Sequence, residues 1–341
     1  MINAAYFRTN STALFFLFIL IFSSAKIVAS EMPQLKCAAL LDKYQNILSG
    51  DDSLRNSDNY KVPVARAFLS FDMYSKAKSL LSEIAEQQLR ELVRSDLIEA
   101  MAKRSVDSEL LEQVNAHEIV EFKIRSYAKM AQYAKTDQAV KVYFKAAEEA
   151  LIVSQKGFWR ERGAINLAEA YAVKGNFKRA MELAAPEFSG EFSPRAYFIV
   201  SANAAFMNDT TLAHLAFELG KTGLDGNLDA HELGKSKVEM LSPIIAMHDS
   251  ATVKKYIQEI VAIAESSTNM DAAIFYADLA DVLSSHDKTE ALNYFGRSAD
   301  RASMIPEKSG KLDAFGILLI YLSRDVENRE AACGSVLPRL L

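Results

Sequence analysis

The chain has 341 residues, of which half are hydrophobic and 24% are charged, with 39 Lys and Arg against 44 Asp and Glu. This composition supports a continuous core and differs from that of a disordered chain. The formal net charge of −5 disfavours nucleic acid as a partner, because an acidic surface repels a phosphate backbone.

Residues 1–30 have the pattern of an export signal. Arg8 precedes an unbroken apolar run over residues 13–22, and small residues follow up to Ala25. The run is too short to span a bilayer. We expect cleavage after Ser30, with Ala25 as the alternative position. No later segment is long and apolar enough to cross a membrane, so the sequence predicts an exported protein, periplasmic or secreted, without membrane insertion after signal removal.

Helical periodicity dominates the rest of the chain. Residues 31–61 are expected to form one amphipathic helix over 33–49, stopped by Gly50, and a polar loop over 51–60. Pro63 then suits the first turn of the next helix. Residues 62–341 alternate helices with short polar breaks, which predicts helical hairpins near 62–88, 90–115, 118–153, 158–186, 194–222, 232–265, 270–303 and 308–337.

A small residue followed twelve positions later by alanine recurs within these hairpins. The pattern is cleanest at Ala168, Tyr171, Gly175 and Ala180. It returns at Ala65, Phe68 and Ala77, and in weaker form at Ser201, Ala204 and Ala213. Small side chains let the backbones of two antiparallel helices approach closely. The fold class predicted is therefore all-α, a solenoid of stacked antiparallel hairpins.

The fourth hairpin resembles the tetratricopeptide repeat family at Leu167, Ala168, Tyr171, Gly175, Asn176, Phe177, Ala180 and Ala184, with Pro186 just after the second helix. The first hairpin is similar, and a weaker resemblance extends over residues 62–303. The family implies a tetratricopeptide-like superhelix over residues 62–341. It also implies a non-catalytic scaffold that binds a protein or peptide on its concave surface.

The resemblance also implies which side chains line the groove. They are Arg162, Ile165, Asn166 and Glu169 on the fourth hairpin, Arg195, Phe198 and Ile199 on the fifth, and Arg125 and Lys129 if the third keeps register. Ile165 and Glu169 occupy places where the family's basic clamp for a terminal carboxylate needs Lys and Asn. Trp159, flanked by arginines, is a candidate anchor for a partner. The alternative interpretation is that these residues form ordinary solvated faces and a hairpin junction.

No pattern predicts a cofactor or a metal site. The chain lacks a glycine-rich phosphate loop and a His-x-x-x-His spacing. Residues 223–229 are similar to a calcium loop, but Ala230 replaces the turn glycine and Ser236 the bidentate acid. We expect the five histidines at the surface or at loop edges.

Two other functions remain as alternatives. Glu265 followed by Ser266 is similar to the catalytic acid of lytic transglycosylases, exported enzymes that can carry a helical superhelix. The glycine-rich segment that should follow in that family is absent, so this cell-wall enzyme is the second choice. A structural subunit of an envelope assembly is the third.

The two cysteines, Cys37 and Cys333, lie at opposite ends of the chain. The ends of an open stack would be tens of ångströms apart, whereas a disulfide needs Cα atoms within about 7 Å. A bridge would require the superhelix to close on itself. We therefore expect two separately buried thiols.

Overall fold

The computed structural model describes residues 35–51, 57–104, 108–224, 228–322 and 329–339, and every regular element in these ranges is helical. The expected signal peptide lies outside the described residues, as do residues 225–227 of the calcium-loop-like segment. The all-α prediction is confirmed. None of the described helices combines the length and hydrophobicity that a bilayer-spanning segment needs.

The described part of the chain begins with α2 (Leu35–Ser49) and then forms eight helix pairs, each close to a predicted hairpin. The pairs are α4 (Asp58–Ser70) with α5 (Tyr74–Glu83), α6 (Gln87–Ala102) with α7 (Ser108–Asn115), α8 (Val120–Tyr133) with α9 (Asp137–Val153), α10 (Phe158–Val173) with α11 (Phe177–Ala184), α13 (Ser193–Phe206) with α14 (Thr210–Thr222), α15 (Ala230–Ala246) with α16 (Ser250–Ser266), α17 (Asn269–Leu283) with α18 (Lys288–Ser303), and α19 (Lys308–Leu322) with α20 (Arg329–Val336). Short helices α12 (Pro186–Ser189), η1 (Gly190–Phe192) and η2 (Leu337–Arg339) complete the described elements.

One boundary differs from the prediction. The segment expected to be a loop up to residue 60 already becomes helical at Asp58, which places Pro63 in the second turn of α4 rather than the first. The Asp58 carboxylate accepts hydrogen bonds from the backbone N–H groups of Ala85 and Glu86 at 2.7 and 2.6 Å. Asp58 therefore joins the start of α4 to the start of α6.

Buried alanines carry the packing, as the spacing predicts. Ala168 and Ala180 are fully buried between α10 and α11, and Tyr171 stacks on Phe144 of α9. Four of the turns within pairs contain a residue in the left-handed conformation: Asp72, Gly175, Asn208 and His248, with φ between 59° and 74°. After each, a backbone N–H bonds a carbonyl five residues back, the usual helix C-terminal motif.

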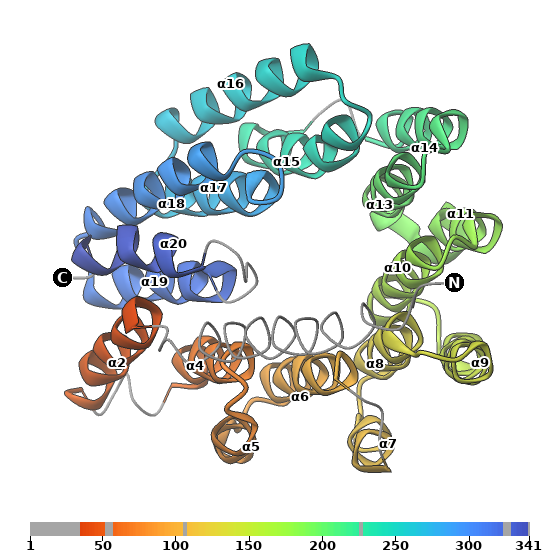
Figure 1. The fold of residues 1–341 in the computed structure, drawn as a ribbon, viewed down its shortest axis with the longest axis horizontal. Helices are drawn as coiled ribbons and strands as arrows, with labels where there is room; N and C mark the ends of the chain where they lie inside the picture. The colour runs from red at the N-terminus through yellow and green to blue at the C-terminus, as the bar shows by residue number, and fades with distance from the viewer. Residues whose placement is uncertain (1–34, 52–56, 105–107, 225–227, 323–328, 340–341) are drawn as a thin grey trace, which may run out of the picture.

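The pairs are arranged as a closed ring (Figure 1). The first helix of each pair, α4, α6, α8, α10, α13, α15, α17 and α19, contacts the next one around the ring, and α19 contacts α4. We call these the inner helices. Among the second helices, α5, α7, α9 and α16 lie clearly outside the inner helices in Figure 1.

The expectation of two separate thiols is wrong. Helix α2 packs on α20, and Cys37 and Cys333 form a disulfide with their Cα atoms 5.0 Å apart. The expectation assumed an open stack. In the structure the small rotation between successive pairs adds up to a full circle, which brings the first and last helices together.

Candidate partner-binding wall

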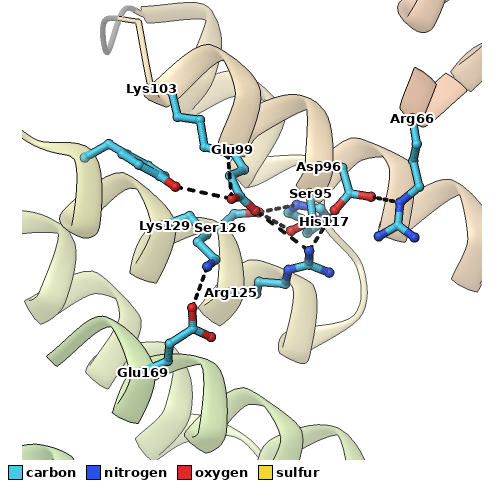
Figure 2. Close-up of polar contacts among 11 residues, drawn as sticks. Arg66, Ser95, Asp96, Glu99, Lys103, His117, Arg125, Ser126, Lys129 and Glu169 are labelled. Atoms are coloured by element: carbon cyan, nitrogen blue, oxygen red, sulfur yellow. Dashed lines mark hydrogen bonds and ion pairs between the residues drawn. The ribbon is translucent and has the colours of Figure 1, made fainter. Parts of the chain in front are cut away.

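A charge network crosses the inner helices α4, α6, α8 and α10 (Figure 2). We use this name for Arg66, Asp96, Glu99, Lys103, Arg125, Lys129, Tyr133 and Glu169. Asp96 of α6 contacts Arg66 of α4 on one side and Arg125 of α8 on the other, the latter at 2.7 Å. Lys129 of α8 then donates to Glu169 of α10 at 2.8 Å. The network thus links four neighbouring inner helices.

Glu99 lies in the middle of this network. Its carboxylate accepts a hydrogen bond from Tyr133 at 3.4 Å and lies 3.2 Å from Lys103 and 3.9 Å from Arg125. Burial would raise the pKa of Glu99, but Lys129, Lys103 and Arg125 outweigh it, so the pKa lies below its ordinary value. Glu99 therefore stays ionised.

For the cations of the network, the pKa is raised rather than lowered. Burial alone would lower the pKa of Lys129, but the carboxylates of Glu169 and Glu99 raise it. The Lys129 and Arg125 side chains are 13% and 18% exposed. Arg125, Lys129 and Glu169, expected on the groove, do share one inner surface, but their charges are engaged with one another.

Arg162 and Trp159 lie at the beginning of α10, in a separate cluster. Arg162 Nε lies 3.1 Å from Oε1 of Glu121, and its guanidinium lies over the Phe158 ring. Trp159 packs edge-on against Phe158 and also contacts Phe122. Trp159 is thus half-buried in an aromatic cluster, as the junction interpretation predicts, whereas Arg162 is 45% exposed.

Asn166 and Arg195 are the remaining polar residues predicted on the groove. The prediction is wrong for Ile165 and Phe198, which are buried, and Phe198 packs against Phe217 of the outer helix α14. The Asn166 amide donates to the carbonyl of Arg162, one turn earlier in the same helix, at 2.9 Å. Arg195 of α13 lies 3.6 Å from Glu239 of α15 and is 58% exposed. Burial raises the pKa of Glu239 more than Arg195 lowers it. Four of the predicted groove residues are cations with an ion-pair partner, namely Arg125, Lys129, Arg162 and Arg195. Arg195 is the most exposed of them.

A hollow lies further along the same face of α13, α15 and α17. It has a volume of about 590 Å³ and is lined by Ala202, Asn203, Phe206, Ser242, Ala246 and Ser285, among others. We call it the rim hollow. Its lining also includes Asn208, His248 and His286, which lie in the turns that connect α13, α15 and α17 to their outer helices, so the hollow lies at the edge of the ring where these turns are.

The chemistry of the rim hollow suits a peptide. Alanine and serine side chains leave the space, and Phe206 is 82% exposed. The Asn203 amide donates to the Ile199 carbonyl at 2.8 Å, and its oxygen and the two serine hydroxyls can hydrogen-bond a ligand. The sequence prediction did not include this hollow, although the helical spacing carried a signal for it. Continuing the helical spacing from Arg195 and Ile199 leads to Asn203 and Phe206 on the same face.

His117 lies in the loop between α7 and α8, one of the two places expected for the histidines, but it is buried. Its Nε2 lies 2.9 Å from Ser126 Oγ, and its Nδ1 contacts Glu91, which also accepts a bond from Arg94 at 2.6 Å. This order of groups is similar to a nucleophilic triad. Ser126 and Glu91 are fully buried, however, and the three side chains join α6 to α8. The arrangement gives a substrate no access.

The surroundings of Glu265 do not favour an acid catalyst. Its carboxylate contacts the Tyr276 hydroxyl, Arg297 at 2.6 Å and Arg301. The hydrogen bond from Tyr276 and the two arginines lower the pKa of Glu265. A general acid in glycoside hydrolysis needs a raised pKa, so this environment has the opposite effect.

Within the described ranges, no group of three or more His, Cys, Asp or Glu side chains is placed to hold a metal ion. Comparison with known proteins adds no assignment, since no family model, no curated protein and no solved structure matches the chain.

Proposed function

We propose that the chain is an exported, tetratricopeptide-like scaffold that binds an extended segment of another protein, or a peptide, on its inner wall. It performs no chemistry of its own. The repeated alanine contacts and the shared left-handed turns support the family relationship. The disulfide supports an oxidising, exported compartment.

The rim hollow is the observation that carries this proposal. An aromatic ring exposed beside small side chains, an amide and two hydroxyls can anchor one apolar side chain and the backbone of an extended peptide. Arg195 lies on the same face of α13 and adds a charged contact. The charge network, by contrast, is expected to keep the wall rigid rather than to contact the partner.

The test is affinity capture with the mature chain from the exported fraction of its source cells, followed by mass spectrometry. A double variant, Phe206→Ala with Asn203→Ala, should lose the captured partner. The matched control is Val153→Ala, because Val153 is also 82% exposed but lies at the end of the outer helix α9. Equal recovery by wild type and both variants would remove the rim hollow as the binding site.

A further inference from the structure

At one contact between neighbouring inner helices, the chain does not run from one helix to the next. Each inner helix is joined to the next inner helix through the outer helix of its pair, except between α19 and α4. We call the contact between α19 and α4 the seam. In the described residues, the Cys37–Cys333 bridge is the covalent link that spans it, through α2 and α20.

The seam is closely packed and also carries polar contacts. Tyr60 of α4 donates a long hydrogen bond of 3.4 Å to the Ser309 carbonyl of α19 and also hydrogen-bonds the Asp313 side chain. Beside the seam, Tyr44 of α2 donates to the Leu312 carbonyl at 3.3 Å, and Lys308 lies 3.1 Å from Asp51. Pro63 packs against Gly316, where a Cβ atom would lie only 3.0 Å from the proline ring. The seam is therefore an ordinary helix contact that requires close approach of the two backbones.

The bridge itself is shielded. Cys37 is fully buried and Cys333 is 1% exposed. Beside it, the buried Arg329 donates to the Ser70 carbonyl at 2.9 Å, and the Lys36 N–H donates to Glu330 at 2.9 Å. A disulfide with this burial resists reduction while the ring is closed, which suits a lasting lock better than a frequently used switch.

We propose that the Cys37–Cys333 bridge locks the ring shut, and that without it the ring opens at the seam while the other inner contacts hold. If each pair rotates slightly less relative to the next than a closed ring requires, these differences add up around the ring. The ring then opens at the seam, where no chain connects the two helices. The open form would expose the inner wall at the seam, on the side of the ring. This inference does not depend on whether the inner wall binds a partner.

Hydrogen exchange measured by mass spectrometry tests the proposal with a Cys37→Ser, Cys333→Ser double variant. Amides of α2, α4, α19 and α20 should exchange about tenfold faster than in the wild type, while those of α8 and α10 change less than about twofold. The radius of gyration from small-angle scattering should rise. Unchanged protection at the seam would overturn the proposal, and so would an equal acceleration in α8 and α10.

The double variant depends on folding without the bridge, so a second experiment starts from folded, oxidised wild type. The protein is reduced with dithiothreitol, alkylated and then subjected to the same exchange measurement. The same pattern is expected, with faster exchange confined to the seam helices. Alkylated protein with wild-type exchange at the seam would contradict the lock.

Discussion

Lys129 and Glu169 join α8 to α10 by an ion pair of 2.8 Å between Nζ and Oε1, although the two residues are 40 positions apart in the sequence. Both were predicted to contact a partner. In the structure they contact each other, and Lys129 has only 13% of its side chain exposed. The pair directs the two charges toward each other and links α8 to α10 across the wall.

Replacing Glu169 by Gln should therefore destabilise the fold. The substitution leaves a nearly buried ammonium without its nearest carboxylate, and we expect a loss of about 1 to 2 kcal/mol in the free energy of unfolding. Urea denaturation measures it. Glu149→Gln is the matched control, because Glu149 is exposed and lies 3.7 Å from the exposed Lys145. The control should cost less than about 0.5 kcal/mol. Equal losses would mean that the network adds no more than a surface pair.

Glu99 should make the stability fall in acid. Its cationic neighbours outweigh burial and lower its pKa below the ordinary value of 4.5. A carboxylate with a lowered folded-state pKa contributes stability above its unfolded-state pKa and loses it as the pH falls through the folded-state pKa. Glu99→Gln should thus be less stable than wild type at pH 7, and this difference should shrink below about pH 4. Urea midpoints of wild type and Glu99→Gln, measured from about pH 3 to about pH 7, would show this change. A difference that stays constant with pH would exclude this role.

For Glu121, the effect of pH on stability should have the opposite sign. Burial raises its pKa above 4.5, more than Arg162 and Arg125 lower it. Ionised Glu121 therefore costs stability near neutral pH, and that cost disappears as the pH falls through the raised pKa. Glu121→Gln should gain stability relative to wild type as the pH rises from acid to neutral. The same urea series measures it, and a relative loss on raising the pH would contradict the assignment.

Ala180→Leu should damage the packing between α10 and α11. Ala180 is fully buried, so three added carbon atoms must displace neighbours, at a cost of about 1 to 3 kcal/mol. Thermal melting followed by circular dichroism measures the loss. Ala262→Leu, at an exposed position of α16, is the control and should change stability by less than about 0.5 kcal/mol. If both variants melt like wild type, the alanine spacing does not report tight packing.

Arg195→Ala should weaken partner capture with little effect on stability. Arg195 is 58% exposed and only 3.6 Å from Glu239, so its pair contributes little to folding. Lys178→Ala, on the exposed face of the outer helix α11, is the control and should capture the partner like wild type. Arg162 is less suitable for this test, because its removal leaves the buried Glu121 without the cation at 3.1 Å. Undiminished capture by Arg195→Ala would place the partner away from this face.

The positions of the helices could be predicted from the sequence because they depend on local spacing. The eight pairs follow the periodicity of apolar residues and the alanines that let neighbouring helices approach, such as Ala168 and Ala180. The helix face that carries Arg195 could also be predicted from the spacing. The same spacing, continued along α13, leads to residues of the rim hollow. These features involve residues a few turns apart.

The tertiary structure alone decided the closure of the ring, the disulfide and the pairing of the wall charges. Closure depends on the sum of small rotations at every contact between pairs, and no local pattern encodes that sum. The same applies to Lys129 and Glu169, whose partners lie on different helices, and to His117, which becomes buried because α6 and α8 pack around it. Local spacing sets where each helix lies in the chain, whereas contacts between distant segments set which side chains remain available to a partner.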